Sequence, residues 1–186
     1  DPAFITEQQD KLCGLVITHA HEDHVGAVPY LWPQLKCPIY TTQFTAMVLR
    51  RKLAEFNLTD EVPIHIIDPD EPQRIGPFDL KWVPLTHSIP EPYALHITTP
   101  VGSIFHTADW KLDPRPVIGE PYRPEVYQAV GKTGITAMVC DSTNATEVGH
   151  SLSEGELFSG LADHVSAAPG RVLIACFGSN VARLQT

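Results

Sequence analysis

The chain has 186 residues, of which 43% are hydrophobic and 19% are charged. This length allows one domain or one and a half, and it is enough to bury a core without disulfide or metal staples. The formal net charge of −9 excludes a general excess of basic surface for nucleic acid, although a local basic groove stays compatible with it. No apolar run approaches the ~18 residues of a membrane span and no segment resembles a signal peptide, so we expect no membrane partner.

The four cysteines form no CxxC pair, and three of them lie in or beside apolar runs. Their pattern favours reduced, buried thiols in a cytoplasmic protein. It argues against a disulfide framework and against a zinc site built from cysteines. The cysteines are Cys13, Cys37, Cys140 and Cys176.

Short apolar runs alternate with helical patterns, which predicts a layered α/β fold. Apolar runs predict strands over residues 12–18, 38–40, 63–67, 78–85, 94–99, 103–106, 135–140 and 171–176. Helical spacing predicts helices over 26–35, ending near Pro33, over 43–56, and from a serine cap at 151 or 153 to about 165. The chain begins without Met and ends on a helical pattern with no stop signal, so we expect a piece of a longer protein.

The strongest chemical signal is the motif THAHEDH at residues 18–24, which follows a predicted strand directly. Imidazole nitrogen and carboxylate oxygen suit divalent ions such as zinc or manganese. His19 and His21 stand two apart, so an extended backbone directs both to one side. Asp23 and His24 follow where the chain turns into a helix, and they can face a second ion. The alternative is a polar loop of surface histidines, but imidazoles this close would suffer charge repulsion or desolvation without a partner.

Two further ligand types come just after later predicted strands, where functional loops collect. His87 follows the strand at 78–85, and Asp109 follows the strand at 103–106. We assign His87 to the first ion and Asp109 as the carboxylate that bridges both ions, which would hold them about 3.5–4 Å apart. Taken alone, each residue is more often an ordinary loop or turn residue. The preceding motif makes the metal interpretation the stronger one.

This set of motifs resembles the metallo-β-lactamase superfamily. Finer motifs resemble its β-CASP nuclease branch and, within that branch, the bacterial ribonuclease J family. They are HAHEDHVGAVP (19–29), THSIPE (86–91), HTADWK (106–111), DSTN (141–144) and FGSN (177–180). The resemblance implies a partial αββα sandwich over residues 1–148, without its N-terminal strands and C-terminal part. It implies the start of a β-CASP α/β domain over residues 149–186.

The resemblance also implies a set of site residues. One ion would be bound by His19, His21 and His87, the second by Asp23 and His24, and both by Asp109. A further histidine ligand of the second ion would lie beyond Thr186. Glu154 matches the family's acidic motif near the site, although a glutamate on a helix face is often just solvated. The catalytic candidates are Asp23, Asp109 and Glu154.

The resemblance implies a metal-dependent ribonuclease of RNA maturation and decay. Its partner would be single-stranded RNA with a 5′-monophosphate. The enzyme would act on this RNA both as a 5′-to-3′ exonuclease and as an endonuclease. The cofactors would be two divalent ions, with zinc favoured over manganese or magnesium, and the full-length protein would be a homo-oligomer. Local RNA contacts could come from Lys111, Arg115 and Arg183, although each can equally be an ordinary surface or cap residue.

Two other functions stay open. The chain could be another hydrolase of the same fold that acts on a small ester or thioester. It could also be a metal-binding module without turnover, because one ligand and most of the RNA-clamping domain would lie outside it. For the same reason we expect the chain alone to be weak or inactive as a nuclease.

Overall fold

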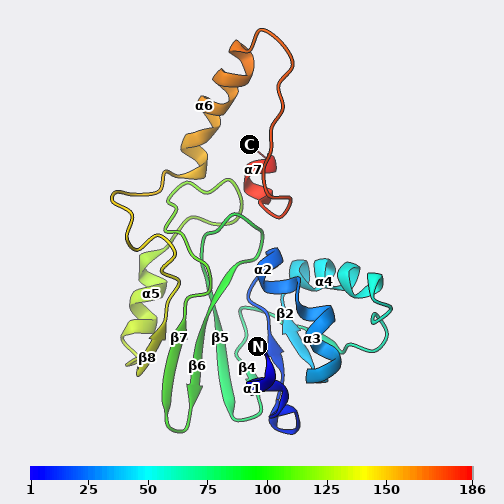
Figure 1. Ribbon diagram of the computed structural model, residues 1–186. Coiled ribbons are helices and arrows are strands. Elements are labelled where there is room, and N and C mark those ends of the chain that lie inside the picture. The colour runs from blue at the N-terminus through cyan, green and yellow to red at the C-terminus, as the bar shows by residue number, and fades with distance from the viewer. Residues whose placement is uncertain (186) are drawn as a thin grey trace.

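The computed structural model describes residues 1–185, which form two sheets with helices on their outer faces (Figure 1). The first sheet contains three parallel strands in the order β1-β2-β3. Parallel neighbours need crossover connections, and these are supplied by α2 and α3 and then by α4. The bounds are β1 (Leu15–Val16), α2 (Glu22–Val25), α3 (Val28–Leu35), β2 (Ile39–Thr41), α4 (Gln43–Glu55) and β3 (Ile64–Ile66). A short helix α1 (Ala3–Thr6) and a 3-10 turn η1 (Gln9–Lys11) precede them.

The second sheet has five strands in the order β4-β5-β6-β7-β8. Its neighbours are antiparallel except β7 and β8, which are parallel and are joined across α5. The sequence Pro-Val-Gly at 100–102 forms the tight connection between β6 and β7. The bounds are β4 (Gln73–Ile75), β5 (Phe78–Pro84), β6 (Tyr93–Thr99), β7 (Gly102–His106), α5 (Pro124–Gly131) and β8 (Ala137–Val139).

Three apolar clusters give the layers of the molecule. One lies between the first sheet and helices α3 and α4, and includes Trp32, Ile39 and Leu49. A second lies between the sheets, where Val16 and Tyr40 of the first sheet pack against the cluster that includes Trp82 and Leu95 of the second. A third lies between the second sheet and α5. The order helix, sheet, sheet, helix confirms the αββα sandwich.

The last two helices leave this sandwich. Helix α6 (Glu154–Ala167) buries no residue and extends away from the sheets, and α7 (Val181–Gln185) returns to the loop that follows β5 (Figure 1). Ser153 caps α6 through a capping box with Glu156, which selects Ser153 over Ser151 as the predicted cap. The division of the chain at residues 148 and 149 stays a prediction.

Several expected elements are corrected by the structure. The strand at 12–18 is limited to β1, and the helix expected to stop near Pro33 includes that residue and ends at Leu35. Residues 171–176 form no strand, since no neighbouring strand within 1–185 pairs with them. Strand β8 is exposed rather than buried, because it is the edge of its sheet. The cysteines are all free, as expected, but only Cys37 is buried, and two of them are exposed.

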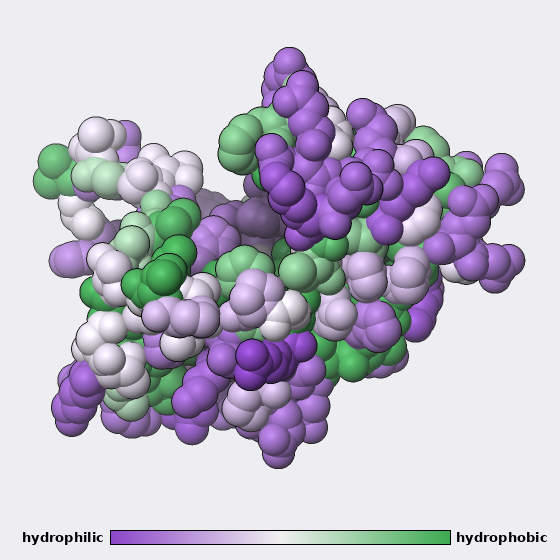
Figure 2. All heavy atoms as spheres, turned by 90° about the horizontal axis from the view of Figure 1, so that it is seen from below, coloured by the Kyte–Doolittle hydropathy of each residue, from purple (hydrophilic) through white to green (hydrophobic). Residues whose placement is uncertain are grey.

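Hydrophobic side chains gather on the side of the molecule where α5 and β8 lie (Figure 2). Exposed members of this region include Ile104 of β7 and Met138 and Val139 of β8. These exposed side chains lie on the last two strands of the second sheet, at its β8 edge. Within residues 1–185, no helix is long and apolar enough to cross a membrane.

Asp113 attaches α6 to the sandwich. Its carboxylate is 2% exposed and accepts hydrogen bonds from Ser153 Oγ at 2.5 Å and from the backbone N–H groups of Glu154 and Arg115, each at 2.9 Å. Burial raises the pKa of Asp113, but these hydrogen bonds outweigh burial and lower the pKa below its ordinary value of 3.8. The charged carboxylate therefore stabilises the folded chain at neutral pH.

We expect Asp113→Asn to lower the free energy of unfolding by about 1–3 kcal/mol at pH 7, because an amide cannot satisfy all three donors. As the pH falls below 3.8, the unfolded chain binds the proton more readily than the folded chain, so the unaltered protein loses stability. The difference in stability between Asp113→Asn and the unaltered protein should therefore shrink as the pH is lowered. Urea unfolding at several pH values measures this. Asp163→Ala, on the exposed part of α6, is the control and should change stability by less than about 0.5 kcal/mol. Equal stability of Asp113→Asn and the unaltered chain at pH 7 would contradict the assignment.

Candidate metal centre

The loop after β1 carries the first ligand types. Thr41 Oγ1 donates a hydrogen bond of 2.8 Å to the carbonyl of Ile17, which fixes the end of β1. His19 follows and is fully buried, with Nδ1 lying 3.1 Å from Thr18 Oγ1. His21 keeps an extended backbone (ψ 151°) at the N-terminal boundary of α2, and α2 then carries Asp23 and His24. The extended stretch and the short helix thus direct all four side chains toward one place.

Two strand-end loops bring the remaining residues to the same place. The loops after β5 and β7 pair through an isolated bridge between Thr86 and Lys111, in which the Lys111 N–H donates to the Thr86 carbonyl at 2.9 Å. Thr86 Oγ1 also donates to the Lys111 carbonyl and accepts from the Asp113 N–H at 3.0 Å. Ala108 has a left-handed backbone (φ 51°), which turns the chain immediately before Asp109. His87 and Asp109 are held by this pairing.

The structure gathers all six predicted ligands, which we call the candidate centre, into two groups that share Asp109. The first group is His19, His21, His87 and Asp109, and the second is Asp23, His24 and Asp109; within each group the ligand atoms lie within 4.8 Å of one another. Asp109 Oδ2 lies 3.2 Å from Nε2 of His24, 3.8 Å from Nε2 of His19 and 3.9 Å from Nε2 of His87. One carboxylate oxygen therefore stands between the two groups.

The donor atoms fit divalent cations. His19 Nε2 is buried and has no hydrogen-bond partner within the described part of the chain, although a buried polar atom without a partner is costly. His21 Nδ1 lies 2.9 Å from His87 Nε2, so two more ring nitrogens face each other. A cation between such nitrogens and the carboxylate would satisfy them together, and neutral imidazole with carboxylate is a ligand set that zinc accepts.

The local electrostatics keep these imidazoles neutral. Burial, followed by the neighbouring His24, His87 and His21, lowers the pKa of His19 to about 2. Burial and then His21 lower the pKa of His87 to about 4, and burial also lowers the pKa of His21. Neutral rings offer lone pairs, which is the form that binds a metal ion.

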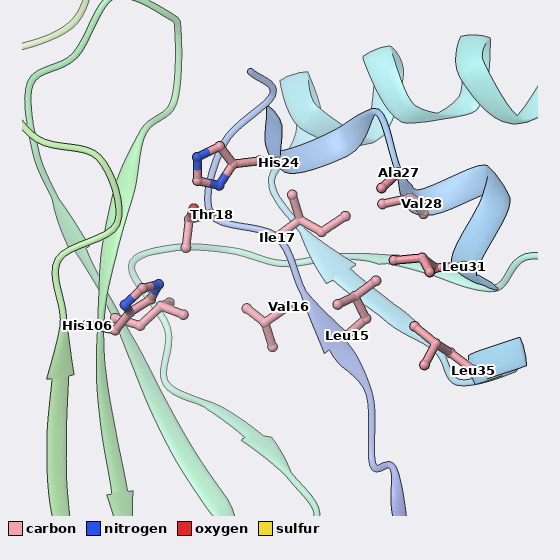
Figure 3. Close-up of a pocket in the computed structure, with 11 residues that line it drawn as sticks. Leu15, Val16, Ile17, Thr18, His24, Ala27, Val28, Leu31, Leu35 and His106 are labelled. Atoms are coloured by element: carbon pink, nitrogen blue, oxygen red, sulfur yellow. The ribbon is translucent and has the colours of Figure 1, made fainter. Parts of the chain in front are cut away.

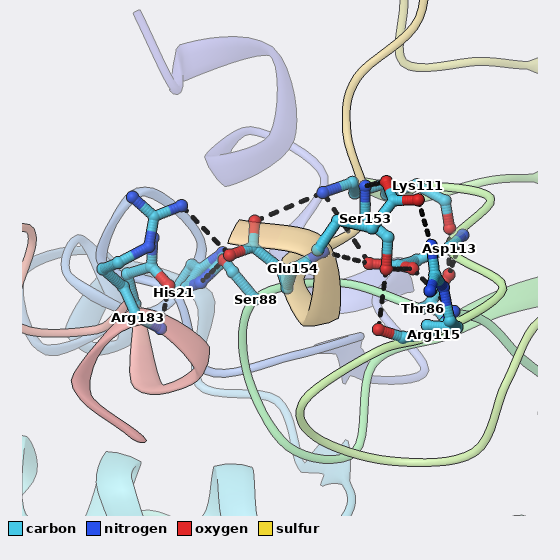
Figure 4. Close-up of polar contacts among 11 residues, drawn as sticks. His21, Thr86, Ser88, Lys111, Asp113, Arg115, Ser153, Glu154 and Arg183 are labelled. Atoms are coloured by element: carbon cyan, nitrogen blue, oxygen red, sulfur yellow. Dashed lines mark hydrogen bonds and ion pairs between the residues drawn. The ribbon is translucent and has the colours of Figure 1, made fainter. Parts of the chain in front are cut away.

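Glu154 lies outside both groups. Its carboxylate accepts hydrogen bonds from Lys111 Nζ at 3.2 Å and from Arg183 Nη2 at 3.0 Å (Figure 4). Burial raises the pKa of Glu154, but the bonds from Arg183 and Lys111 outweigh it and lower the pKa. Arg115 pairs in the same way with Glu156. The catalytic role of Glu154 stays a prediction, and the three basic residues considered for RNA contact are each paired with a carboxylate of α6.

An apolar cavity of about 200 Å³ adjoins the second group (Figure 3). His24 and His106 line it together with aliphatic side chains of β1 and α3, such as Val16 and Leu31. The cavity offers few polar atoms, so additional ligands for the second group do not come from its aliphatic walls.

Ser88 is a site residue that the sequence analysis did not single out. Its Oγ lies 3.2 Å from Nε2 of His21, whereas His87 lies next to Nδ1, the other nitrogen of that ring. The sequence offered one signal for this role, since Ser88 places a hydroxyl directly after His87, a predicted metal ligand.

Residues 1–144 match the family model of the beta-lactamase superfamily domain, and the chain therefore belongs to the beta-lactamase superfamily. The chain is 44% identical to ribonuclease J of Sinorhizobium meliloti, and the match covers all of this chain and 33% of that protein. It is 36% identical to ribonuclease J of Thermus thermophilus, over 98% of this chain and 33% of that protein. The chain thus spans about a third of the length of the curated relatives it matches, and the resemblance to ribonuclease J is confirmed.

A solved structure supports the fold alone. The crystal structure of a protein of unknown function from Enterococcus faecalis matches 85% of this chain and 40% of its own, with a TM-score of 0.58 and 20% sequence identity.

The shared position of Asp109 predicts a distinctive pattern of metal loss. Asp109→Ala should weaken binding of both cations, whereas His21→Ala should weaken only the first and Asp23→Ala only the second. We expect losses of about 100-fold or more, since even outer partners of metal ligands cost 10–100-fold. Zinc bound per chain, measured at buffered free zinc concentrations, gives the result. Asp60→Ala, an exposed residue, is the matched control. Two zinc ions retained by Asp109→Ala would contradict the shared carboxylate.

Proposed function

We propose that this chain carries the metal centre of a ribonuclease that hydrolyses RNA phosphodiester bonds. The observation that carries the proposal is the pair of ligand groups sharing Asp109 Oδ2, in a chain 44% identical to a ribonuclease J. One cation would be held by the first group and a second by the second group. Zinc is favoured by the imidazole-rich set, and manganese or magnesium are the alternatives.

Two divalent cations held together lower the pKa of water and neutralise charge on phosphate oxygens. The chain's own residues supply the positioning. Asp109 joins the two groups, and the neutral rings of His19 and His87 keep their lone pairs for metal binding. The Asp23 side chain is 75% exposed, with Oδ2 3.7 Å from His24 Nε2, so its carboxylate can orient an incoming water molecule as well as bind metal.

The charge distribution favours this use of the centre. The net charge is −9, and Lys111, Arg115 and Arg183 are paired with Glu154 or Glu156. The positive charge of these side chains is largely balanced by the two carboxylates of α6, so they leave little positive charge free to attract RNA. An RNA phosphate must therefore be attracted at the site itself. Cations at the candidate centre provide positive charge where the reacting phosphate would lie.

The finer assignments follow the ribonuclease J resemblance. They are 5′-to-3′ exonuclease action on single-stranded RNA with a 5′-monophosphate, together with endonuclease action. The place of action would be RNA maturation and decay in the cytoplasm, by a homo-oligomer of the full-length protein. Residues from 149 onward would begin a β-CASP domain, and Glu154 at the start of α6 would lie beside the site.

An RNA decay assay tests the proposal. Labelled single-stranded RNA with a 5′-monophosphate, incubated with this chain and manganese, should be shortened, if slowly, and a chelator should stop the reaction. His21→Ala should lower the rate about 100-fold or more, because a metal contributes several kcal/mol to the transition state. Asp60→Ala should keep the rate of the unaltered chain.

The same assay separates the other two functions. If the chain hydrolyses a chromogenic thioester but leaves the RNA intact, the proposal is contradicted and a small-molecule hydrolase is supported. Two bound cations without hydrolysis of either substrate would contradict turnover and support a metal-binding module.

A further inference from the structure

The two nitrogens of His21 have different surroundings. Nδ1 faces Nε2 of His87 at 2.9 Å, inside the first group. Nε2 lies 3.2 Å from Ser88 Oγ (Figure 4). A neutral imidazole carries its hydrogen on one nitrogen and a lone pair on the other. If Nδ1 is to offer its lone pair to a cation, Nε2 must carry the hydrogen and needs an acceptor. The Ser88 hydroxyl oxygen lies at that position.

Ser88 is itself held in place from two directions. The preceding residues Thr86 and His87 belong to the loop that is bridged to Lys111. From the other side, the Ala182 N–H donates to the Ser88 carbonyl at 3.0 Å, and the next residue, Arg183, binds Glu154. The hydroxyl therefore has a defined position relative to His21.

We propose that Ser88 is a positioning residue for metal binding. Its Oγ accepts a hydrogen bond from Nε2–H of His21, which fixes the tautomer whose Nδ1 is open to a divalent cation. This inference rests on the proposed function, because it requires that the first group binds a cation. Outer partners of this kind orient a ligand ring and typically change metal affinity by 10–100-fold.

Zinc affinity measured by competition with a chromophoric chelator tests the role of the hydroxyl. Ser88→Ala should weaken zinc binding about 10–100-fold, and Ser88→Thr, which keeps a hydroxyl, should restore it. Ser159→Ala, on the exposed surface of α6, is the matched serine control and should bind like the unaltered chain. Circular dichroism establishes that each variant is folded.

Imidazole nitrogen chemical shifts of the zinc-bound, unaltered chain provide a readout that a purely structural role would not give. We expect His21 to carry its hydrogen on Nε2 and to bind zinc through Nδ1. A hydrogen on Nδ1 of His21 would overturn the inference, and this measurement decides the question if Ser88→Ala does not fold.

The outcomes also separate the two proposals. If the unaltered chain binds no zinc, both the proposed function and the role of Ser88 are overturned. If folded Ser88→Ala binds two zinc ions as tightly as the unaltered chain, only the role of Ser88 is overturned.

Discussion

The structure depends on a crowding of imidazoles around one carboxylate. The His19 ring centroid lies 4.0 Å from that of His24 and about 5 Å from those of His21 and His87. Burial, and then the neighbouring imidazoles, oppose protonation of His19 and lower its pKa to about 2. His19 Nε2 also has no hydrogen-bond partner within residues 1–185, and a divalent cation at this place would satisfy its lone pair.

The fold provides this crowding through loops at the ends of strands. Strands β1, β5 and β7 end at the same side of the sandwich, and the bridge between Thr86 and Lys111 fixes two of the three loops to each other. Thr86 and Asp113 extend the same hydrogen-bond network to the start of α6. Packing of the two sheets therefore determines the distances at the centre, and the segment that follows the sandwich is attached to that centre through Asp113, Glu154 and Ser88.

The sequence predicts those parts of the molecule in which local pattern and chemistry agree. The motif at residues 18–24 follows an apolar run, and His87 and Asp109 each follow a strand with clear boundaries, so their meeting could be expected before the structure was known. The alternation of apolar runs and helical patterns predicts a layered α/β fold, and the αββα order of the layers is implied by the resemblance to the metallo-β-lactamase superfamily. The strand bounds were less accurate, because pairing partners decide where a strand ends.

Other features depend on contacts between distant segments and could not be read from local pattern. Residues 171–176 are apolar enough for a strand, but a strand also needs a neighbour, and none lies beside them among residues 1–185. The bond between Ser88 and His21 joins residues 67 positions apart. The pairing of Glu154 with Arg183 likewise requires the return of α7 to the sandwich.

The most direct test of the account is the anomalous scattering of zinc in crystals of this chain. The account predicts two peaks, one among His19, His21, His87 and Asp109 and one among Asp23, His24 and Asp109, with the Asp109 carboxylate contacting both ions. Zinc peaks confined to other parts of the surface, with both groups of side chains bound to no ion at saturating zinc, would contradict it.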